Sequence, residues 1–209
     1  RLWGWRVNYR KDEYNMTYPT IGIGIIGSGY MGKHHAAAMA GVGSMCNSTL
    51  RPRLEIISAR SQEKANAKAL EFGFGRGTDD WRAVIDDPAV DAVIVATPAA
   101  NHFEMCMAAI KAGKHVFCEK PMGKSFEEAS ALANAAEEAG VMTMAGYNYA
   151  KTPATQFVRE MLANGEIGDI TYLRCEHTED FHANPQAEWW WRSDGIHNGT
   201  LNELSCHVI

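Results

Sequence analysis

The stretch "IGIGIIGSGYMGKHHAAAMA", residues 21–40, decides the fold. Its apolar run 21–26 predicts a buried strand, and a glycine-rich turn joins that strand to a helix. Gly27, Gly29 and Gly32 have the spacing G-x-G-x-x-G, which permits a tight turn, a close approach of the backbone to a pyrophosphate, and close helix–strand packing. The helix N-terminus adds N–H donors and a positive dipole. The stretch therefore predicts a dinucleotide site, although an ordinary glycine-rich turn also fits the spacing taken alone.

Short apolar runs and amphipathic stretches keep alternating as far as about residue 146. We predict strands at 21–26, 54–59, 92–97, 115–118 and 141–146, and helices at 31–41, 62–72, 100–112 and 126–139. The last helix is the best marked, because Ser125 and Glu128 can cap its start and Gly140 can end it. Strict alternation implies parallel strands joined by crossover helices, so the predicted class is α/β with a doubly wound parallel sheet.

The pattern changes after about residue 150. Residues 152–168 predict a helix with a glycine stop, residues 169–181 alternate like a strand with one polar face, and a tryptophan-rich stretch follows at 184–199. We divide the chain into an N-terminal extension (1–15), a nucleotide-binding domain (16–147) and the beginning of a second domain (148–209). The first methionine is Met16, and the chain stops at Ile209 inside an apolar pattern with no cap or turn signal.

Composition narrows the class of protein. With 46% hydrophobic and 22% charged residues and a net charge of -5, the chain has the composition of a soluble globular protein. It has no basic run that would favour nucleic acid or an anionic membrane as partner. The five cysteines are scattered and never spaced C-x-x-C, which argues against a disulfide framework or zinc knuckle and fits a reducing cytosol. The prediction is a cytoplasmic protein that binds a small molecule.

The end of the second predicted strand bears on the choice of dinucleotide. Ala59 stands where a carboxylate usually binds the ribose 2′-hydroxyl, and Arg60 and Ser61 follow it. A guanidinium and a hydroxyl suit a 2′-phosphate, so NADP is favoured over NAD, with a solvated arginine as the alternative.

Ionic residues follow the buried strand 115–118. Glu119 and Lys120 precede Pro121, and charges at the end of a buried strand are costly unless solvent, a partner or a ligand satisfies them. This arrangement predicts a ligand crevice at the carboxyl end of that strand.

Several motifs together resemble the Gfo/Idh/MocA oxidoreductases. They are "GIIGSGYMGKHH" (24–35), "ATPAANH" (96–102), "AGKHVFCEKP" (112–121), "GYNY" (146–149) and "NGEIGDI" (164–170). The resemblance implies an N-terminal Rossmann domain and a C-terminal α+β domain with an open, mainly antiparallel sheet. It also implies hydride transfer between a nicotinamide cofactor and a sugar, inositol or related polyol, in a protein that forms homo-oligomers at full length. Because members of the family are usually considerably longer, the resemblance implies that this chain is a fragment of such an enzyme.

The resemblance assigns catalytic roles to three residues. Lys120 would hold the substrate hydroxyl and stabilise alkoxide character, and His207 would act as general base. Glu203 would orient His207 from four residues away on one helix face, although glutamate replaces the family's usual aspartate.

The resemblance also implies contacts to cofactor and substrate. The predicted cofactor contacts are Gly27, Gly29, Tyr30, Met31, Gly32, Arg60, Ser61, Thr97, Pro98, His102, Glu119, Lys120 and Asn148. The predicted substrate contacts are Lys120, His177, Trp191, Arg192 and His207.

Other readings remain open. His177 and Glu179 would share one face of a strand while Asp180 and His182 share the other, so we predict no metal site. A non-catalytic dinucleotide-binding or regulatory protein, or an inactive fragment, is the first alternative. A dihydrodiol or biliverdin-type reductase of the same fold is the second.

Overall fold

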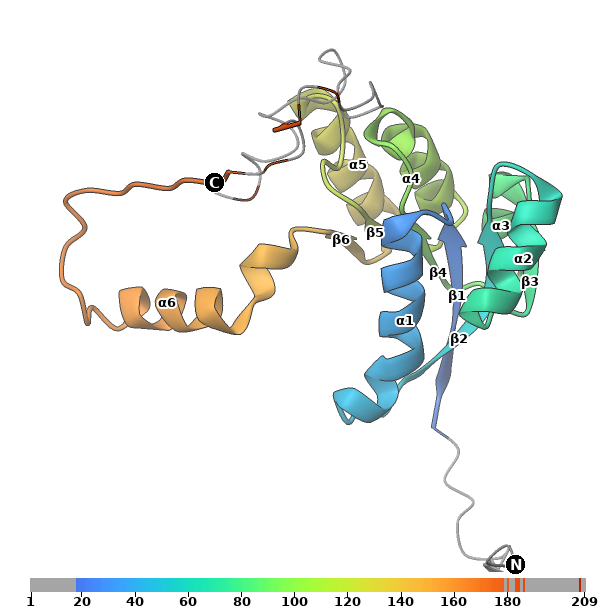
Figure 1. Cartoon of the computed structure of the whole chain (residues 1–209), viewed down its shortest axis with the longest axis horizontal. Helices are drawn as coiled ribbons and strands as arrows, with labels where there is room; N and C mark the ends of the chain where they lie inside the picture. Colours follow the sequence, from blue (N-terminus) through green and yellow to red (C-terminus); the bar gives the residue numbers. More distant parts are fainter. Residues whose placement is uncertain (1–17, 179, 181–182, 185, 187–206, 208–209) are drawn as a thin grey trace, which may run out of the picture.

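The computed structural model describes residues 18–178, 180, 183–184, 186 and 207 (Figure 1). The strands are β1 (Thr20–Ile26), β2 (Arg51–Ser58), β3 (Arg76–Thr78), β4 (Ala92–Val95), β5 (His115–Cys118) and β6 (Thr143–Ala145). The α-helices are α1 (Tyr30–Met45), α2 (Gln62–Phe72), α3 (Trp81–Asp86), α4 (His102–Lys111), α5 (Phe126–Ala139) and α6 (Pro153–Ala163). Two short 3₁₀-helices are η1 (Ala99–Asn101) and η2 (Asn148–Lys151).

The six strands form one parallel sheet in the order β3-β2-β1-β4-β5-β6. From β1 the chain proceeds outward to β2 and β3, then returns to β4 on the other side of β1. The topological switch point therefore lies between β1 and β4, where ligands of doubly wound sheets bind beyond the carboxyl ends of the strands. The predicted α/β class with a doubly wound parallel sheet is confirmed, whereas the open antiparallel sheet expected for the second domain stays a prediction.

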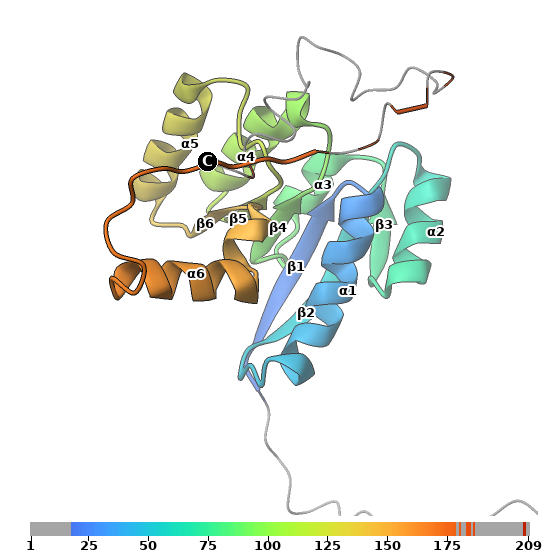
Figure 2. The same cartoon turned by 60° about the vertical axis from the view of Figure 1, so that its left-hand side comes forward.

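Helices cover both faces of the sheet, as Figures 1 and 2 show. Successive residues of β4 illustrate why: Ile94 packs into the apolar cluster that includes Ala36 of α1 and Ala69 of α2. Val93 and Val95 pack into the opposite cluster, with residues of α3, α4 and α5. Because neighbouring strand residues point to opposite faces, a continuous apolar run buries both sides. Each fully buried aliphatic side chain contributes about 1.5–3 kcal/mol.

Two predicted helices have the bounds the sequence indicated, because their capping signals are local. Ser61 and Ser125 accept hydrogen bonds from Lys64 N and Glu128 N at the starts of α2 and α5. Gly140 ends α5 in the left-handed conformation, with φ 66°. Such caps satisfy backbone groups that the helix itself leaves unpaired.

Two elements were not predicted. The strand β3 and the helix α3 are only three and six residues long, too short for a periodic pattern. Asp80 was the available signal, because its side chain caps α3 by accepting from Arg82 N at 2.9 Å.

The predicted strand at 169–181 is wrong over its described residues. Residues 169–178 form no strand in the structure. A strand requires ladder hydrogen bonds to a neighbour, and the six-stranded sheet of the described residues ends at β6. The prediction that His177 and Asp180 lie on opposite faces of a strand is therefore wrong, because His177 is not in a strand. The helix predicted for 152–168 is shorter, since α6 ends at Ala163 and turns follow.

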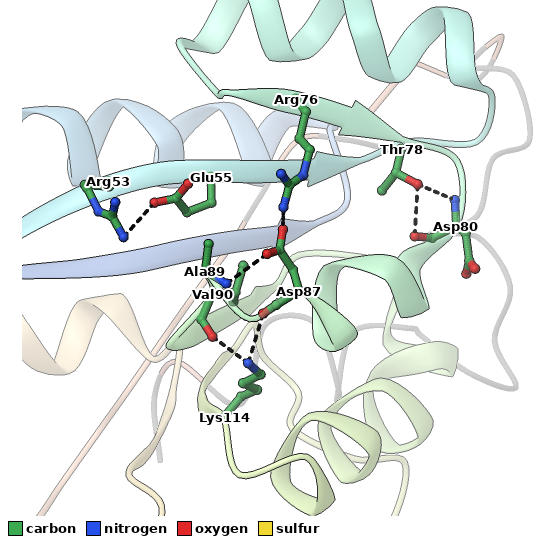
Figure 3. Close-up of polar contacts among 9 residues, drawn as sticks. All are labelled: Arg53, Glu55, Arg76, Thr78, Asp80, Asp87, Ala89, Val90 and Lys114. Atoms are coloured by element: carbon green, nitrogen blue, oxygen red, sulfur yellow. Dashed lines mark hydrogen bonds and ion pairs between the residues drawn. The ribbon is translucent and has the colours of Figure 1, made fainter.

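A polar network stabilises the amino ends of β3, β4 and β5 (Figure 3). Asp87, with 4% of its side chain exposed, forms an ion pair with Arg76 and accepts from Ala89 N at 2.9 Å. Lys114 Nζ donates to the backbone oxygens of Asp87 and Val90 at 3.0 and 2.7 Å. These contacts join the first residue of β3 to the loops that precede β4 and β5, at the end of the sheet opposite the glycine turn.

Substituting Asp87→Ala should destabilise the fold by about 1–3 kcal/mol, because it removes the acceptor of the partly buried Ala89 N–H and the partner of Arg76. The exposed neighbour gives the control, since Asp86→Ala should cost less than about 0.5 kcal/mol. Urea unfolding followed by circular dichroism measures both. Equal midpoints for the two variants would contradict the role assigned to Asp87.

Candidate functional site

The glycine turn after β1 has the geometry of a phosphate cradle. Gly27 has φ +109°, and a Cβ there would lie 2.5 Å from the backbone oxygen of Ala96. A Cβ on Gly32 would lie 2.0 Å from the oxygen of Gly27. Both positions therefore require glycine. A Cβ on Gly29 meets nothing within 4 Å, so this backbone faces open space into which a ligand can approach.

The N-terminus of α1 is available to an anion. Its N-cap is Gly29, which supplies no capping side chain, and its first turn contains no acidic residue. Tyr30 and Met31 are exposed there. Unsatisfied N–H groups and the positive end of the helix dipole favour a phosphate. The residues present thus fit a dinucleotide diphosphate.

The end of β2 lies beside this cradle, because Ser58 pairs with Ile26. Ala59 N donates to Thr78 O at 3.0 Å, and Arg60 is exposed. Ser61 accepts from Lys64 N at 3.3 Å as the cap of α2, so its oxygen already has a structural role and its hydroxyl proton remains a donor. The structure thus places the exposed guanidinium of Arg60 just after β2, and the residue between them, Ala59, has no carboxylate.

Thr97 and Pro98 lie in the loop after β4, and His102 is the first residue of α4. Thr97 is partly buried and Pro98 is exposed, whereas His102 is 1% exposed. Its Nδ1 lies 2.7 Å from Pro121 O and its Nε2 lies 2.8 Å from Thr97 O. The imidazole thus lies between the loops that follow β4 and β5.

The loop after β5 carries the charged pair. Glu119 N donates to Val95 O at 2.9 Å, which continues the β4–β5 ladder. The Glu119 carboxylate is buried and lies 2.6 Å from Nε2 of His35 on α1. Lys120 follows, partly buried. The structure therefore places Lys120 beyond the carboxyl end of β5, directly after the residue that contacts α1.

Cys118, the residue before Glu119 and Lys120, does not supply a nucleophile. Cys118 is buried, and a hydrogen bond with Cys106 together with burial raises the pKa of its thiol far above the usual range. The thiol stays neutral at physiological pH, so thiolate chemistry is not expected of it.

Three aromatic rings come together near the GYNY segment. The ring of Tyr149 packs edge-on against His177 and His207, with centroids 5.7 and 4.8 Å away. The two imidazoles are stacked at 5.6 Å. The structure thus brings together two predicted substrate residues that are distant in sequence. Asn148 is exposed one residue before Tyr149, whereas the predicted residues Glu203, Trp191 and Arg192 lie outside the described residues.

Sequence reasoning missed His35 and Tyr149. His35 lies three residues after Gly32, so the two residues share one face of α1. Nothing in the sequence indicated that Glu119 would be the partner of His35. Tyr149 stood inside a quoted motif without a role. Within the described ranges, no three histidine, cysteine or acidic side chains are grouped to hold a metal ion, and no helix there is long and apolar enough to cross a membrane.

The doubly wound sheet, the glycine cradle and the open helix N-terminus define a dinucleotide-binding Rossmann protein. Residues 21–147 match the model of an oxidoreductase family with an NAD-binding Rossmann fold, and residues 155–209 match the GFO/IDH/MocA C-terminal domain. The chain belongs to the Gfo/Idh/MocA oxidoreductase family.

Known relatives act on sugars and inositols. Levoglucosan dehydrogenase of Pseudarthrobacter phenanthrenivorans is 35% identical over 192 residues, covering 90% of this chain and 49% of that protein. The NADP(+)-linked scyllo-inositol 2-dehydrogenase of Bacillus subtilis is 29% identical over 191 residues, covering 91% and 50%. The structure of levoglucosan dehydrogenase with NADH and levoglucosan has a TM-score of 0.84 at 34% identity, covering 91% of this chain and 52% of that one. The chain spans about half the length of these relatives.

Proposed function

We propose that this chain carries the cofactor site and the catalytic lysine of an oxidoreductase that transfers hydride between a nicotinamide dinucleotide and a hydroxyl-bearing carbon of a sugar, inositol or related polyol. The observation that carries the proposal is the position of Lys120, two residues after the end of β5. The neighbour of β5 in the sheet, β4, adjoins β1, the strand that leads into the glycine cradle. Relatives named for a sugar anhydride and for an inositol support a cyclic polyol as substrate.

The chain's own residues would bind the cofactor through Gly27, Gly29 and the N-terminus of α1. The bound nicotinamide supplies the hydride acceptor in oxidation and the hydride donor in reduction. Lys120 would donate a hydrogen bond to the substrate hydroxyl oxygen and stabilise the negative charge that develops on it. The residue thereby lowers the barrier at the atom where charge grows.

His207 would accept the hydroxyl proton as the carbon–hydrogen bond breaks, and would return it in the reverse direction. Its contact with Tyr149 supports this role, because the same segment, 146–149, also lies against the carboxylate of Glu119, beside Lys120. The segment thus links the proposed base to the proposed lysine. Glu203 would orient the imidazole.

We further propose that NADP is preferred over NAD, because Arg60 is exposed just after the end of β2 and Ala59 offers no side-chain acceptor for a ribose hydroxyl. Arg60→Ala should weaken NADPH binding about 10–100-fold and leave NADH binding within about twofold, since one charge-assisted contact to phosphate is lost. Tryptophan-to-nicotinamide energy transfer measures both constants. The exposed Lys64→Ala variant is the control, and equal losses for both nucleotides in Arg60→Ala would contradict the preference.

The division into a nucleotide-binding domain (16–147) and the beginning of a substrate domain (148–209) is part of the proposal, and the two family matches support it. The other cofactor contacts proposed are Thr97, Pro98 and Asn148, with His177, Trp191 and Arg192 toward the substrate.

Titration with NADPH and NADH tests the function first, followed by a panel of levoglucosan, inositols and simple sugars in which NADPH formation is monitored. Binding in the micromolar range and turnover of at least one cyclic polyol are expected. Failure to bind either nucleotide would overturn the proposal, and binding without turnover would favour a non-catalytic dinucleotide-binding protein.

A further inference from the structure

Each of the two residues that flank Lys120 contacts a histidine, one partly buried and one fully buried. Glu119, before it, contacts His35 through its carboxylate, and Pro121, after it, contacts His102 through its carbonyl oxygen. The two histidines belong to α1 and to the start of α4, far from Lys120 in sequence.

The first contact joins the lysine loop to the phosphate-binding helix. The side chains of His35 and Glu119 are 14% and 10% exposed, and Nε2 lies 2.6 Å from Oε1. The imidazole also packs edge-on against Phe117 of β5 at 4.8 Å. A buried carboxylate needs a donor, since desolvation without one is costly. His35 supplies it from the helix whose N-terminus forms the cradle.

Gly146 closes the other side of the same carboxylate. A Cβ on Gly146 would lie 3.2 Å from both carboxylate oxygens of Glu119, and Gly146 N donates to Cys118 O at 2.8 Å. The carboxylate is therefore enclosed between α1 and the segment after β6. Glu119 therefore has little freedom to move, which restricts the position of the Lys120 backbone that follows it.

The second contact, between His102 and Pro121, restricts the residue that follows Lys120. His102 is 1% exposed and its Nδ1 lies 2.7 Å from Pro121 O, while Nε2 lies 2.8 Å from Thr97 O. Both partners are carbonyl oxygens, which only accept, so a neutral imidazole donates to one of them and an imidazolium donates to both. His102 thus connects the loop after β4 to the loop after β5.

We propose that His35 and His102 form a two-histidine clamp that positions Lys120. Neither imidazole is given a role in touching the reacting atoms, so both are positioning residues. The catalytic part of this inference rests on the function proposed above, whereas the structural part does not. A lysine side chain has four rotatable carbons, so its ammonium is placed accurately only if its backbone is fixed. Misplacement of a catalytic group by about 1 Å can cost about 100-fold in rate.

Hydrogen exchange of the full chain, read by mass spectrometry, tests the clamp without requiring activity. In His35→Leu, the peptide 115–122 should exchange at least about tenfold faster than in the wild type, because Glu119 loses its donor. In His35→Gln the amide nitrogen can take the place of Nε2, so exchange should stay within about threefold. The α2 peptide, 62–72, should be unchanged in both variants.

Two substitutions at His102 separate its two contacts. An asparagine amide can take the place of Nδ1 and keep the bond to Pro121, whereas a glutamine amide can take the place of Nε2 and keep the bond to Thr97. The clamp predicts that His102→Asn protects 115–122 better than His102→Gln does. The reverse order, no change in His35→Leu, or equal acceleration in every peptide of the chain would overturn the proposal.

Turnover then connects the clamp to catalysis. With the polyol that the wild type oxidises, kcat should fall about 10–100-fold in His35→Leu and His102→Gln, with the Kd for NADPH within about threefold. His35→Gln should recover most of kcat. If the wild type turns over no polyol, the proposed function fails, and hydrogen exchange alone decides the clamp.

Discussion

Replacement of Lys120 by methionine is expected to lower kcat for the polyol about 10²–10³-fold while leaving the Kd for NADPH within about threefold. Methionine keeps the length and apolar stem of lysine but removes the ammonium, so the hydroxyl oxygen loses the donor that stabilises its developing charge. The loss should fall on kcat because the interaction strengthens as charge grows.

Lys124→Met gives a matched control for this prediction. Lys124 is exposed four residues further along the same loop, and its backbone N–H, which donates to Glu128 at 2.7 Å, survives the substitution. Its kcat should stay within about twofold of the wild type, as expected of a surface change. Steady-state kinetics with saturating NADPH or NADP measures both variants. If Lys120→Met raised KM alone, the lysine would only bind substrate, and the role in stabilising the alkoxide would be wrong.

The features that the sequence predicted correctly are those fixed by neighbours in the chain. Gly27 and Gly32 could be assigned because a tight turn and a close helix approach depend on local backbone geometry. Ser125 and Gly140 marked the ends of α5 for the same reason. The alternation of strands and helices then specified the parallel sheet, since crossover connections permit few alternatives.

The features that the sequence missed depend on contacts across the fold. His35 and Glu119 are 84 positions apart, and no periodicity relates a helix residue to a loop that follows the fifth strand. The contact of Tyr149 with His207 is similar, because it joins segments that only the tertiary structure brings together. The strand predicted at 169–181 failed for a related reason: alternation shows that a segment can pair, but a strand exists only where a partner accepts its hydrogen bonds.

Replacement of Gly29 by aspartate is expected to weaken binding of NADPH and NADH at least about 100-fold. A Cβ at this position meets no atom within 4 Å, so the side chain would extend into the open space that the dinucleotide needs. Its carboxylate would also repel the diphosphate at the N-terminus of α1. Substitution at Gly27 is a poorer test, because its φ of +109° and the nearby Ala96 oxygen would strain the fold itself.

The aspartate should have the opposite effect on the unliganded protein. Gly29 is the N-cap of α1, and aspartate at an N-cap accepts from the first backbone N–H groups and interacts favourably with the helix dipole, which stabilises a helix by a few tenths of a kcal/mol relative to glycine. Thermal unfolding without ligand should therefore show an unchanged or slightly raised Tm, while NADPH should no longer raise it. Gly29→Ala provides the uncharged control and should retain part of the affinity. If the aspartate variant still bound NADPH with wild-type affinity, the diphosphate would not lie at this cradle; if it unfolded, the open environment assigned to Gly29 would be wrong.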